Sequence, residues 1–145
     1  PITYQRLDSE PKVETIDFDP IFKDSLYFVH LNQKQSSKEA IANYKNRQFD
    51  RNKLIQEISS ITHKMIEVPT LAGFESLMEK HENLLSGVLQ EQPVKQRLFP
   101  DYFGRIKSLG AWGGDFVLAT GDEKTITYFK DKGYSTVIPY SRMIF

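Results

Sequence analysis

The 145-residue sequence contains no cysteine. Disulfide bonds, thiolate metal sites and thiol nucleophiles are therefore excluded, and the composition is compatible with a reducing compartment. Long hydrophobic runs are also lacking, because no apolar stretch approaches the roughly 18–20 residues of a membrane-spanning helix, and nothing resembles a signal peptide. These absences predict a soluble, cytoplasmic protein that has no membrane partner.

Neither sign of charge is in excess, since 19 lysines and arginines balance 19 aspartates and glutamates. Without a net basic field we expect no nucleic-acid partner, although a local basic patch is compatible with the composition. His30, His63 and His81 lack paired carboxylates at ligand spacing, so we expect no zinc site. We also find no serine in a nucleophile elbow and no outstanding carboxylate pair for acid–base chemistry.

The length is typical of one domain, and a composition that is 39% hydrophobic, with 10 Phe and 7 Tyr, provides a core. We therefore predict a single domain over residues 1–145. Pro1 leads directly into the alternating segment 2–7 without an initiator methionine. This start suggests that the sequence is part of a longer polypeptide.

Alternating and apolar segments predict the first elements. Residues 2–7 and 13–18 are typical of two strands of an opening hairpin around the turn-prone segment 8–11. The apolar run 26–31 predicts a buried strand. Ser36 and Glu39 then fit a capping box, which predicts a helix that begins near Ser36.

Two longer helices are predicted next, as an insertion over residues 50–90. Asp50 can cap the first helix and Pro69 ends it, while Thr70 can cap the second. Each has one apolar face at helical spacing, so we expect the two to pack as a pair. The first face consists of Leu54, Ile55, Ile58, Ile61, Met65 and Ile66, and the second of Leu71, Phe74, Leu77, Met78, His81, Leu84, Leu85, Val88 and Leu89.

The C-terminal third predicts two strands, a helix and a last strand. The strands are expected at 105–109 and 116–120, and Asp122 and Gly133 mark the start and end of the helix. Pro139 cannot donate to a sheet ladder, so the strand 136–140 should lie at an edge or stop there. Without the hairpin and the insertion, the order is β-α-β-β-α-β, which predicts an α+β, ferredoxin-like sandwich.

The segment between the two expected strands, Lys107-Ser-Leu-Gly-Ala-Trp-Gly-Gly-Asp115, holds three glycines within five residues. Glycines leave successive backbone N–H groups free to cradle a phosphate. The spacing alone also fits a glycine-rich turn or bulge that binds nothing. The segment is neither a Walker A loop, because no Lys-Ser or Lys-Thr follows the last glycine, nor a GxGxxG motif that opens a helix.

With the apolar run 116–119 that follows it, this segment resembles the third conserved motif of the GHMP small-molecule kinases, such as galactokinase, homoserine kinase, mevalonate kinase and phosphomevalonate kinase. The match covers the lysine, the Gly-Ala pair, the last two glycines and the aspartate. The predicted element order with its helical insertion is also similar to the C-terminal domain of that family. The resemblance covers most of the chain in topology but only this segment in motif.

In that family the third motif lies beside the ATP phosphate loop and helps to shape the place where the acceptor meets the γ-phosphate. The resemblance implies that the backbone turn here is formed by Gly110, Ala111, Gly113 and Gly114. Trp112 departs from the pattern, which usually has glycine at that place. If this position needs a positive φ, the loop is reshaped or the indole walls the acceptor pocket. Asp115 is interpreted either as a turn-capping carboxylate or as a polar wall of the site.

Further candidate substrate contacts are Lys34, Ser36, Ser37 and Lys107. The first three lie between a strand end and a helix N-terminus, where an anion is favoured. A capping box with solvated neighbours explains them equally. Lys95 and Arg97 would add positive charge near a phosphorylated or carboxylated acceptor, or are ordinary surface residues.

The first and second motifs of the family and its catalytic aspartate have no counterpart in this sequence. The chain therefore resembles the C-terminal half of an ATP-dependent kinase for a small mevalonate-, phosphomevalonate- or sugar-like metabolite. No catalytic residue is assigned to it, and it is expected to be inactive without its partner, the N-terminal half, which would hold most of the ATP and Mg²⁺. The alternatives are a non-enzymatic, ferredoxin-like ligand-binding or regulatory module and a dimerisation domain that uses the two long helices.

Overall fold

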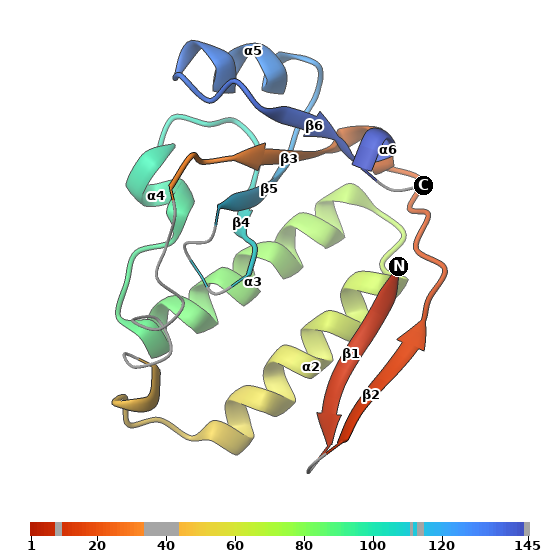
Figure 1. The fold of residues 1–145 in the computed structure, drawn as a ribbon, viewed down its shortest axis with the longest axis vertical. Helices are drawn as coiled ribbons and strands as arrows, with labels where there is room; N and C mark the ends of the chain where they lie inside the picture. The colour runs from red at the N-terminus through yellow and green to blue at the C-terminus, as the bar shows by residue number, and fades with distance from the viewer. Residues whose placement is uncertain (8–9, 34–43, 111, 113–114, 144–145) are drawn as a thin grey trace.

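The computed structural model describes residues 1–7, 10–33, 44–110, 112 and 115–143, which form an α+β fold with two antiparallel sheets (Figure 1). In chain order the elements are β1 (Ile2–Leu7), β2 (Glu10–Thr15), the 3-10 helix η1 (Lys23–Ser25), β3 (Leu26–His30), α2 (Arg51–Glu67), α3 (Leu71–Leu89), α4 (Val94–Leu98), β4 (Ile106–Ser108), β5 (Phe116–Thr120), α5 (Lys124–Asp131), β6 (Val137–Pro139) and α6 (Tyr140–Met143).

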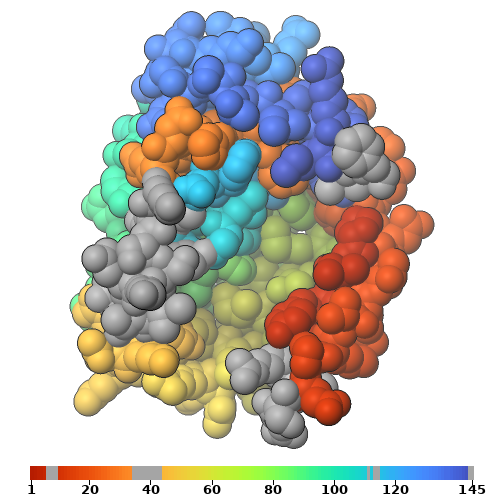
Figure 2. All heavy atoms as spheres, in the orientation of Figure 1, coloured from red at the N-terminus to blue at the C-terminus, as the bar shows by residue number. Residues whose placement is uncertain are grey.

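The strands β1 and β2 form the predicted hairpin as a separate two-stranded sheet. They pair from Ile2 opposite Thr15 to Leu7 opposite Glu10. The prediction of the second strand at 13–18 is wrong in position, because Pro11 lies inside the strand and not in the turn. A proline is tolerated there because the strand is at an edge. The hairpin forms one flank of the face shown in Figure 2, beside α2, and every residue of β2 is exposed.

The second sheet has four strands in the order β4-β5-β3-β6, and each neighbouring pair is antiparallel. The apolar strand β3 is internal and β6, which ends at Pro139, is at an edge, as the sequence predicts. Since β3 and β4 are both antiparallel to β5, they run parallel to each other with β5 between them.

The helices α2 and α3 follow each other in the chain and lie side by side (Figure 1). Both predicted caps are confirmed: the Asp50 carboxylate accepts from the Lys53 backbone N–H at 2.9 Å, and the Thr70 hydroxyl accepts from the Gly73 N–H at 3.2 Å. The apolar face of α2 is narrower than predicted, because Ile55 is 59% exposed. The helix predicted from Ser36 lies outside the described residues.

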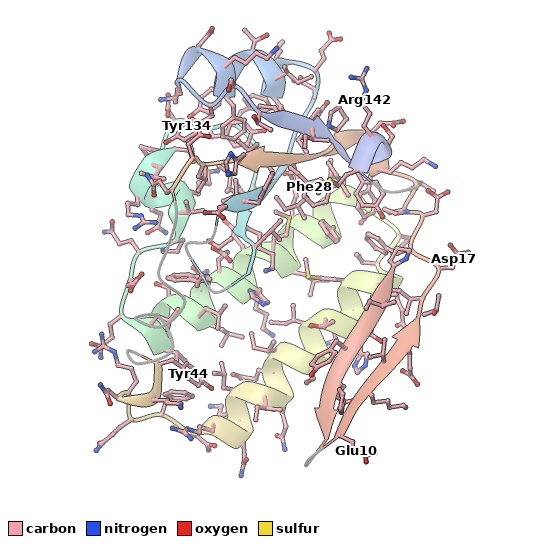
Figure 3. All side chains as sticks on the ribbon, in the orientation of Figure 1. Glu10, Asp17, Phe28, Tyr44, Tyr134 and Arg142 are labelled. Atoms are coloured by element: carbon pink, nitrogen blue, oxygen red, sulfur yellow. The ribbon has the colours of Figure 1, made fainter. Side chains whose placement is uncertain are left out.

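Both faces of the four-stranded sheet are covered by helices, because alternate residues of each strand point to opposite faces. One face packs against α4 and α5, and its core contains Val29, Val117, Phe99, Tyr102 and Phe129. The opposite face packs against α3, and its core contains Leu26, Leu118, Phe74, Met78 and Tyr140. Figure 3 shows Phe28 on the α3 side of β3 and Tyr134 on the α5 side.

The predicted end of the C-terminal helix is confirmed, whereas its N-cap is Glu123, one residue after the predicted Asp122. The Asp122 carboxylate accepts from the Lys124 N–H at 2.9 Å, at the first turn of α5. Gly133 has a φ of 89°, and the N–H of Tyr134 bonds back to the Phe129 carbonyl at 2.9 Å, which closes the helix end. After this helix end the chain returns to the sheet as β6.

Candidate functional site

The glycine-rich segment joins β4 to β5, as the sequence predicts. Pairing continues one step beyond β4, where the Leu109 N–H donates to the Phe116 carbonyl at 3.1 Å. Gly110 has a φ of 69° and is exposed, and no atom lies within 4 Å of the position that a Cβ would take there. Glycine is therefore required by the backbone conformation, not by crowding. Ala111, Gly113 and Gly114 lie outside the described residues.

Trp112 also has a left-handed backbone, with a φ of 46°. Its side chain is only 7% exposed, and the indole Nε1–H donates to the Glu82 carboxylate of α3 at 3.2 Å. The indole is therefore turned toward α3 and buried. The same carboxylate accepts from the Ser108 hydroxyl, at the end of β4, at 3.1 Å.

Lys107 is half-buried between the glycine segment and α3. Its ammonium group donates to the Ser108 carbonyl at 3.1 Å. Burial lowers the pKa of Lys107, and the charge of the nearby Glu82 opposes this shift. Lys107 therefore places an ammonium group in β4, next to the start of the glycine-rich connection.

The C-terminal end of β3 lies beside the glycine segment. The Leu31 N–H donates to the carbonyl of Asp115 at 2.7 Å, and the rings of His30 and Phe116 are 4.8 Å apart. Asp115 itself is exposed. The chain that leaves β3 thus starts next to the segment, although the candidate contacts Lys34, Ser36 and Ser37 lie outside the described residues.

Three glutamates of α3 face the strands β4 and β5, and sequence reasoning missed all of them. Glu75 accepts from the Thr120 hydroxyl, Glu79 pairs with Arg105 at 3.3 Å, and Glu82 binds Ser108 and Trp112. Their spacing of four and three residues places them along one side of the helix. In the sequence, this helical spacing of three glutamates beside the apolar face was the signal that they share one side of the helix.

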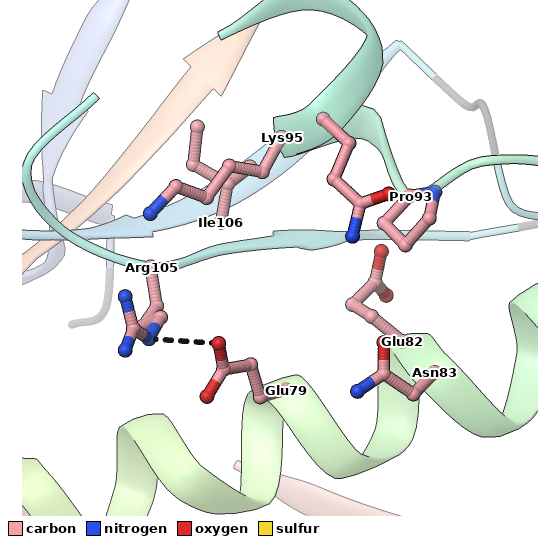
Figure 4. Close-up of a pocket in the computed structure, with 8 residues that line it drawn as sticks. Glu79, Glu82, Asn83, Pro93, Lys95, Arg105 and Ile106 are labelled. Carbon is pink, nitrogen blue, oxygen red and sulfur yellow. Dashed lines mark ion pairs between the residues drawn. The ribbon is translucent and has the colours of Figure 1, made fainter. Parts of the chain in front are cut away.

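A small pocket of about 120 Å³ opens between α3, α4 and β4 (Figure 4). Its lining is mostly polar: Glu79, Glu82, Asn83, Pro93, Lys95, Gln96, Arg105 and Ile106. The Lys95 ammonium donates to the Gly104 carbonyl at 2.6 Å, and burial lowers the pKa of Lys95. Glu82 both lines this pocket and accepts the hydrogen bonds from Ser108 and Trp112. Arg97, the other predicted basic contact, is exposed and does not line this pocket.

Within the described part of the chain, no group of three His, Asp or Glu side chains is arranged to hold a metal ion. Searching the same residues for a helix with the length and apolarity to cross a bilayer finds none.

The geometry brings some of the predicted residues together. Gly110 and Trp112 lie in the connection that follows β4, Lys107 lies in β4, and Glu82 of α3 binds Trp112. The end of β3 lies next to Asp115. Such a turn can bind and orient an anionic group through backbone N–H groups and one nearby ammonium group. Comparisons of the chain with protein-family models, with curated proteins and with solved structures found no match.

Proposed function

We propose that this chain is the C-terminal, substrate-side portion of an ATP-dependent GHMP-type kinase that phosphorylates a small hydroxylated or phosphorylated metabolite. The observation that carries the proposal is the turn between β4 and β5. Two of its positions, Gly110 and Trp112, have left-handed backbone, as expected for a segment that resembles a glycine-rich family motif. The space beside the Gly110 Cα is open, which leaves room for a phosphate-bearing ligand.

The strand order supports a ferredoxin-like unit as the framework of this site. In such a split β-α-β arrangement, two parallel strands are separated by an antiparallel one, and β3, β5 and β4 have this relation. The helix α3 lies on the face opposite α5, so we assign α2 and α3 to the insertion. The first helix of the unit is then the one predicted from Ser36.

Phosphoryl transfer of this kind depends mainly on positioning and charge stabilisation. We assign to this chain the wall beside the γ-phosphate, formed by the turn of residues 110–115 with Lys107 at its base. The described residues offer no group of three carboxylate or imidazole side chains for a metal, so the proposal assigns Mg²⁺, most of the ATP contacts and the catalytic aspartate to the N-terminal half.

The test begins with the coding sequence upstream of Pro1. We expect a Gly-Leu-Gly-Ser-Ser-like loop within about one domain length, ~150 residues. The full-length protein is then assayed for ADP release with ATP, Mg²⁺ and a panel of small hydroxylated metabolites. Absence of the loop, or absence of ADP release across the panel, would sink the proposal. Calorimetric binding of a metabolite to the 145-residue chain without nucleotide would instead favour the ligand-binding module.

A matched pair of variants connects activity to the turn. Gly110→Ala places a Cβ on a left-handed backbone, which costs about 1–2 kcal/mol of strain. Gly87 lies in α3 with no atom within 4 Å of the position of a Cβ, so Gly87→Ala is the control without such strain. We expect Gly110→Ala to lower kcat/KM about tenfold and Gly87→Ala to leave it unchanged. Equal activities of the two variants would remove the turn from the active site.

A further inference from the structure

Trp112 occupies a backbone conformation that is unfavourable for a side chain of its size. A left-handed φ costs a non-glycine residue about 1–2 kcal/mol, and such strain persists only where the surroundings determine it. Trp112 has a φ of 46° and is almost fully buried. Something beyond the turn itself must therefore hold it.

The contacts that hold it converge on Glu82, which is 2% exposed. One carboxylate oxygen, Oε1, accepts from the Trp112 indole at 3.2 Å, and the other, Oε2, accepts from the Ser108 hydroxyl at 3.1 Å. Ser108 is the last residue of β4, and Trp112 lies four residues further on. One carboxylate thus joins the start and the middle of the glycine segment.

A buried carboxylate is costly unless donors satisfy both of its oxygens. The charged groups near Glu82 include Lys107, which interacts with it through its charge, and Glu79, Lys95 and Arg105, which line the same pocket. His81 Nδ1 lies 3.8 Å from Oε1. His81 Nδ1 is buried and has no hydrogen-bond partner. The two donors from Ser108 and Trp112 are thus the contacts that satisfy the carboxylate, and its position determines theirs.

We propose that Glu82 is the positioning residue of the glycine segment: by binding Trp112 and Ser108 together it fixes the left-handed conformation of Trp112 and couples the position of that residue to α3. The inference deepens the proposed function and rests on it for its catalytic consequence. A turn held in one geometry presents its backbone N–H groups without reorganisation when a phosphate binds. In this role the indole connects the glycine segment to α3 through its hydrogen bond to Glu82.

The structural part of the inference is tested in the 145-residue chain, where Trp112 is the sole tryptophan and its fluorescence reports on the turn alone. Glu82→Leu keeps most of the volume of the side chain but offers no acceptor to the Ser108 hydroxyl or to the Trp112 indole. We expect a red-shifted emission and a loss of protection from acrylamide quenching. The matched control is Glu79→Leu, one turn earlier, at a residue that contacts Arg105 and not Trp112; its emission should equal that of the wild type.

Far-UV circular dichroism shows whether Glu82→Leu remains folded. If it unfolds, Ser108→Ala takes its place, because it removes one of the two donors and leaves Glu82 and Trp112 intact; the same red shift and loss of protection are expected. Wild-type emission and quenching in the folded variant would overturn the inference.

The catalytic part is measured in the full-length protein. We expect Glu82→Leu to lower kcat/KM about tenfold, which corresponds to the backbone strain that its contacts offset. Glu67→Leu, at an exposed glutamate of α2 outside the site, should leave kcat/KM unchanged. The two readouts separate the two failures. An altered emission in Glu82→Leu together with an inactive wild-type kinase would overturn only the proposed function, whereas unaltered emission together with an active kinase would overturn only the role of Glu82.

Discussion

Tyr102 shows how much a single buried hydroxyl contributes at the residue scale. Its side chain is 3% exposed, and its hydroxyl donates to the Thr120 carbonyl at 2.8 Å and pairs with the Thr125 hydroxyl at 2.8 Å. These bonds connect the loop before β4 with the end of β5 and the start of α5. Burial raises the pKa of Tyr102 to about 12, because the phenolate would lose its hydration.

This pKa predicts a loss of stability in alkaline solution. Tyrosine in the unfolded chain ionises near pH ~10, so between pH ~10 and ~12 the unfolded state binds fewer protons than the folded state. The free energy of unfolding therefore falls as the pH rises through this window, by about 2–3 kcal/mol for two pKa units. Tyr102→Phe should remove this part of the alkaline decline. At neutral pH the same variant should lower the free energy of unfolding by about 1 kcal/mol, because its hydrogen bonds are lost.

Urea unfolding at several pH values from 7.5 to 12 measures this effect, with Tyr4→Phe as the control, since Tyr4 is 64% exposed. The control should retain the full alkaline decline. A decline in Tyr102→Phe as steep as in the wild type would contradict the assignment.

At the scale of elements, α3 carries more of the architecture than any other helix described. Its apolar face covers the sheet, its glutamates contact β4 and β5, and it supports the candidate site. Its start depends on the Thr70 hydroxyl, which satisfies the Gly73 N–H.

Removal of the cap by Thr70→Ala should lower the free energy of unfolding by about 1 kcal/mol. Thr70→Ser keeps the hydroxyl and is the matched control, for which we expect a change of a few tenths of a kcal/mol, since serine and threonine are both favoured caps. The midpoints of urea unfolding give both values. Equal losses in the two variants would show that the methyl group, not the hydroxyl, matters at this position.

Local signals in the sequence predicted most of these elements. The caps Asp50 and Thr70, the end of α5 at Gly133 and the edge position of β6 follow from side chains that act on their own backbone neighbours, and all are confirmed. The start of β2 was misplaced because Pro11 is typical of turns, whereas cross-strand pairing with β1 decides its conformation.

The candidate site was predictable only in part, for the same reason. The glycines mark the turn, and the positive φ of Gly110 agrees with them. Glu82 went unnoticed because a glutamate within an apolar stripe is usually solvated at its border. Its burial depends on donors from Ser108 and Trp112, which only the folded chain brings to it.

At the scale of the whole molecule, the hairpin stands apart from the four-stranded sheet. Ile2, Tyr4 and Val13 of the hairpin are each more than half exposed, whereas β3 and β5 are packed between helices. A two-stranded hairpin is marginally stable by itself. The local free energy of opening should therefore differ strongly between the two sheets.

Hydrogen exchange followed by mass spectrometry measures this difference. We expect the amides of β1 and β2 to exchange by local opening, well before those of β3 and β5, which should exchange only on global unfolding. Equal protection of both sheets would contradict this expectation and would indicate that the hairpin is held more firmly than its exposure implies.

The position of β3 in the sheet also has a consequence for the order of folding. Both of its neighbours, β5 and β6, come from the far end of the chain, and Leu26 pairs with Thr120. During synthesis β3 therefore emerges with two unpaired edges and keeps them until nearly the whole chain exists. The local pair α2–α3 forms in the meantime, because closing a short loop costs less entropy than closing a long one. We therefore expect the sheet, and with it the connection between β4 and β5, to assemble after the helix pair.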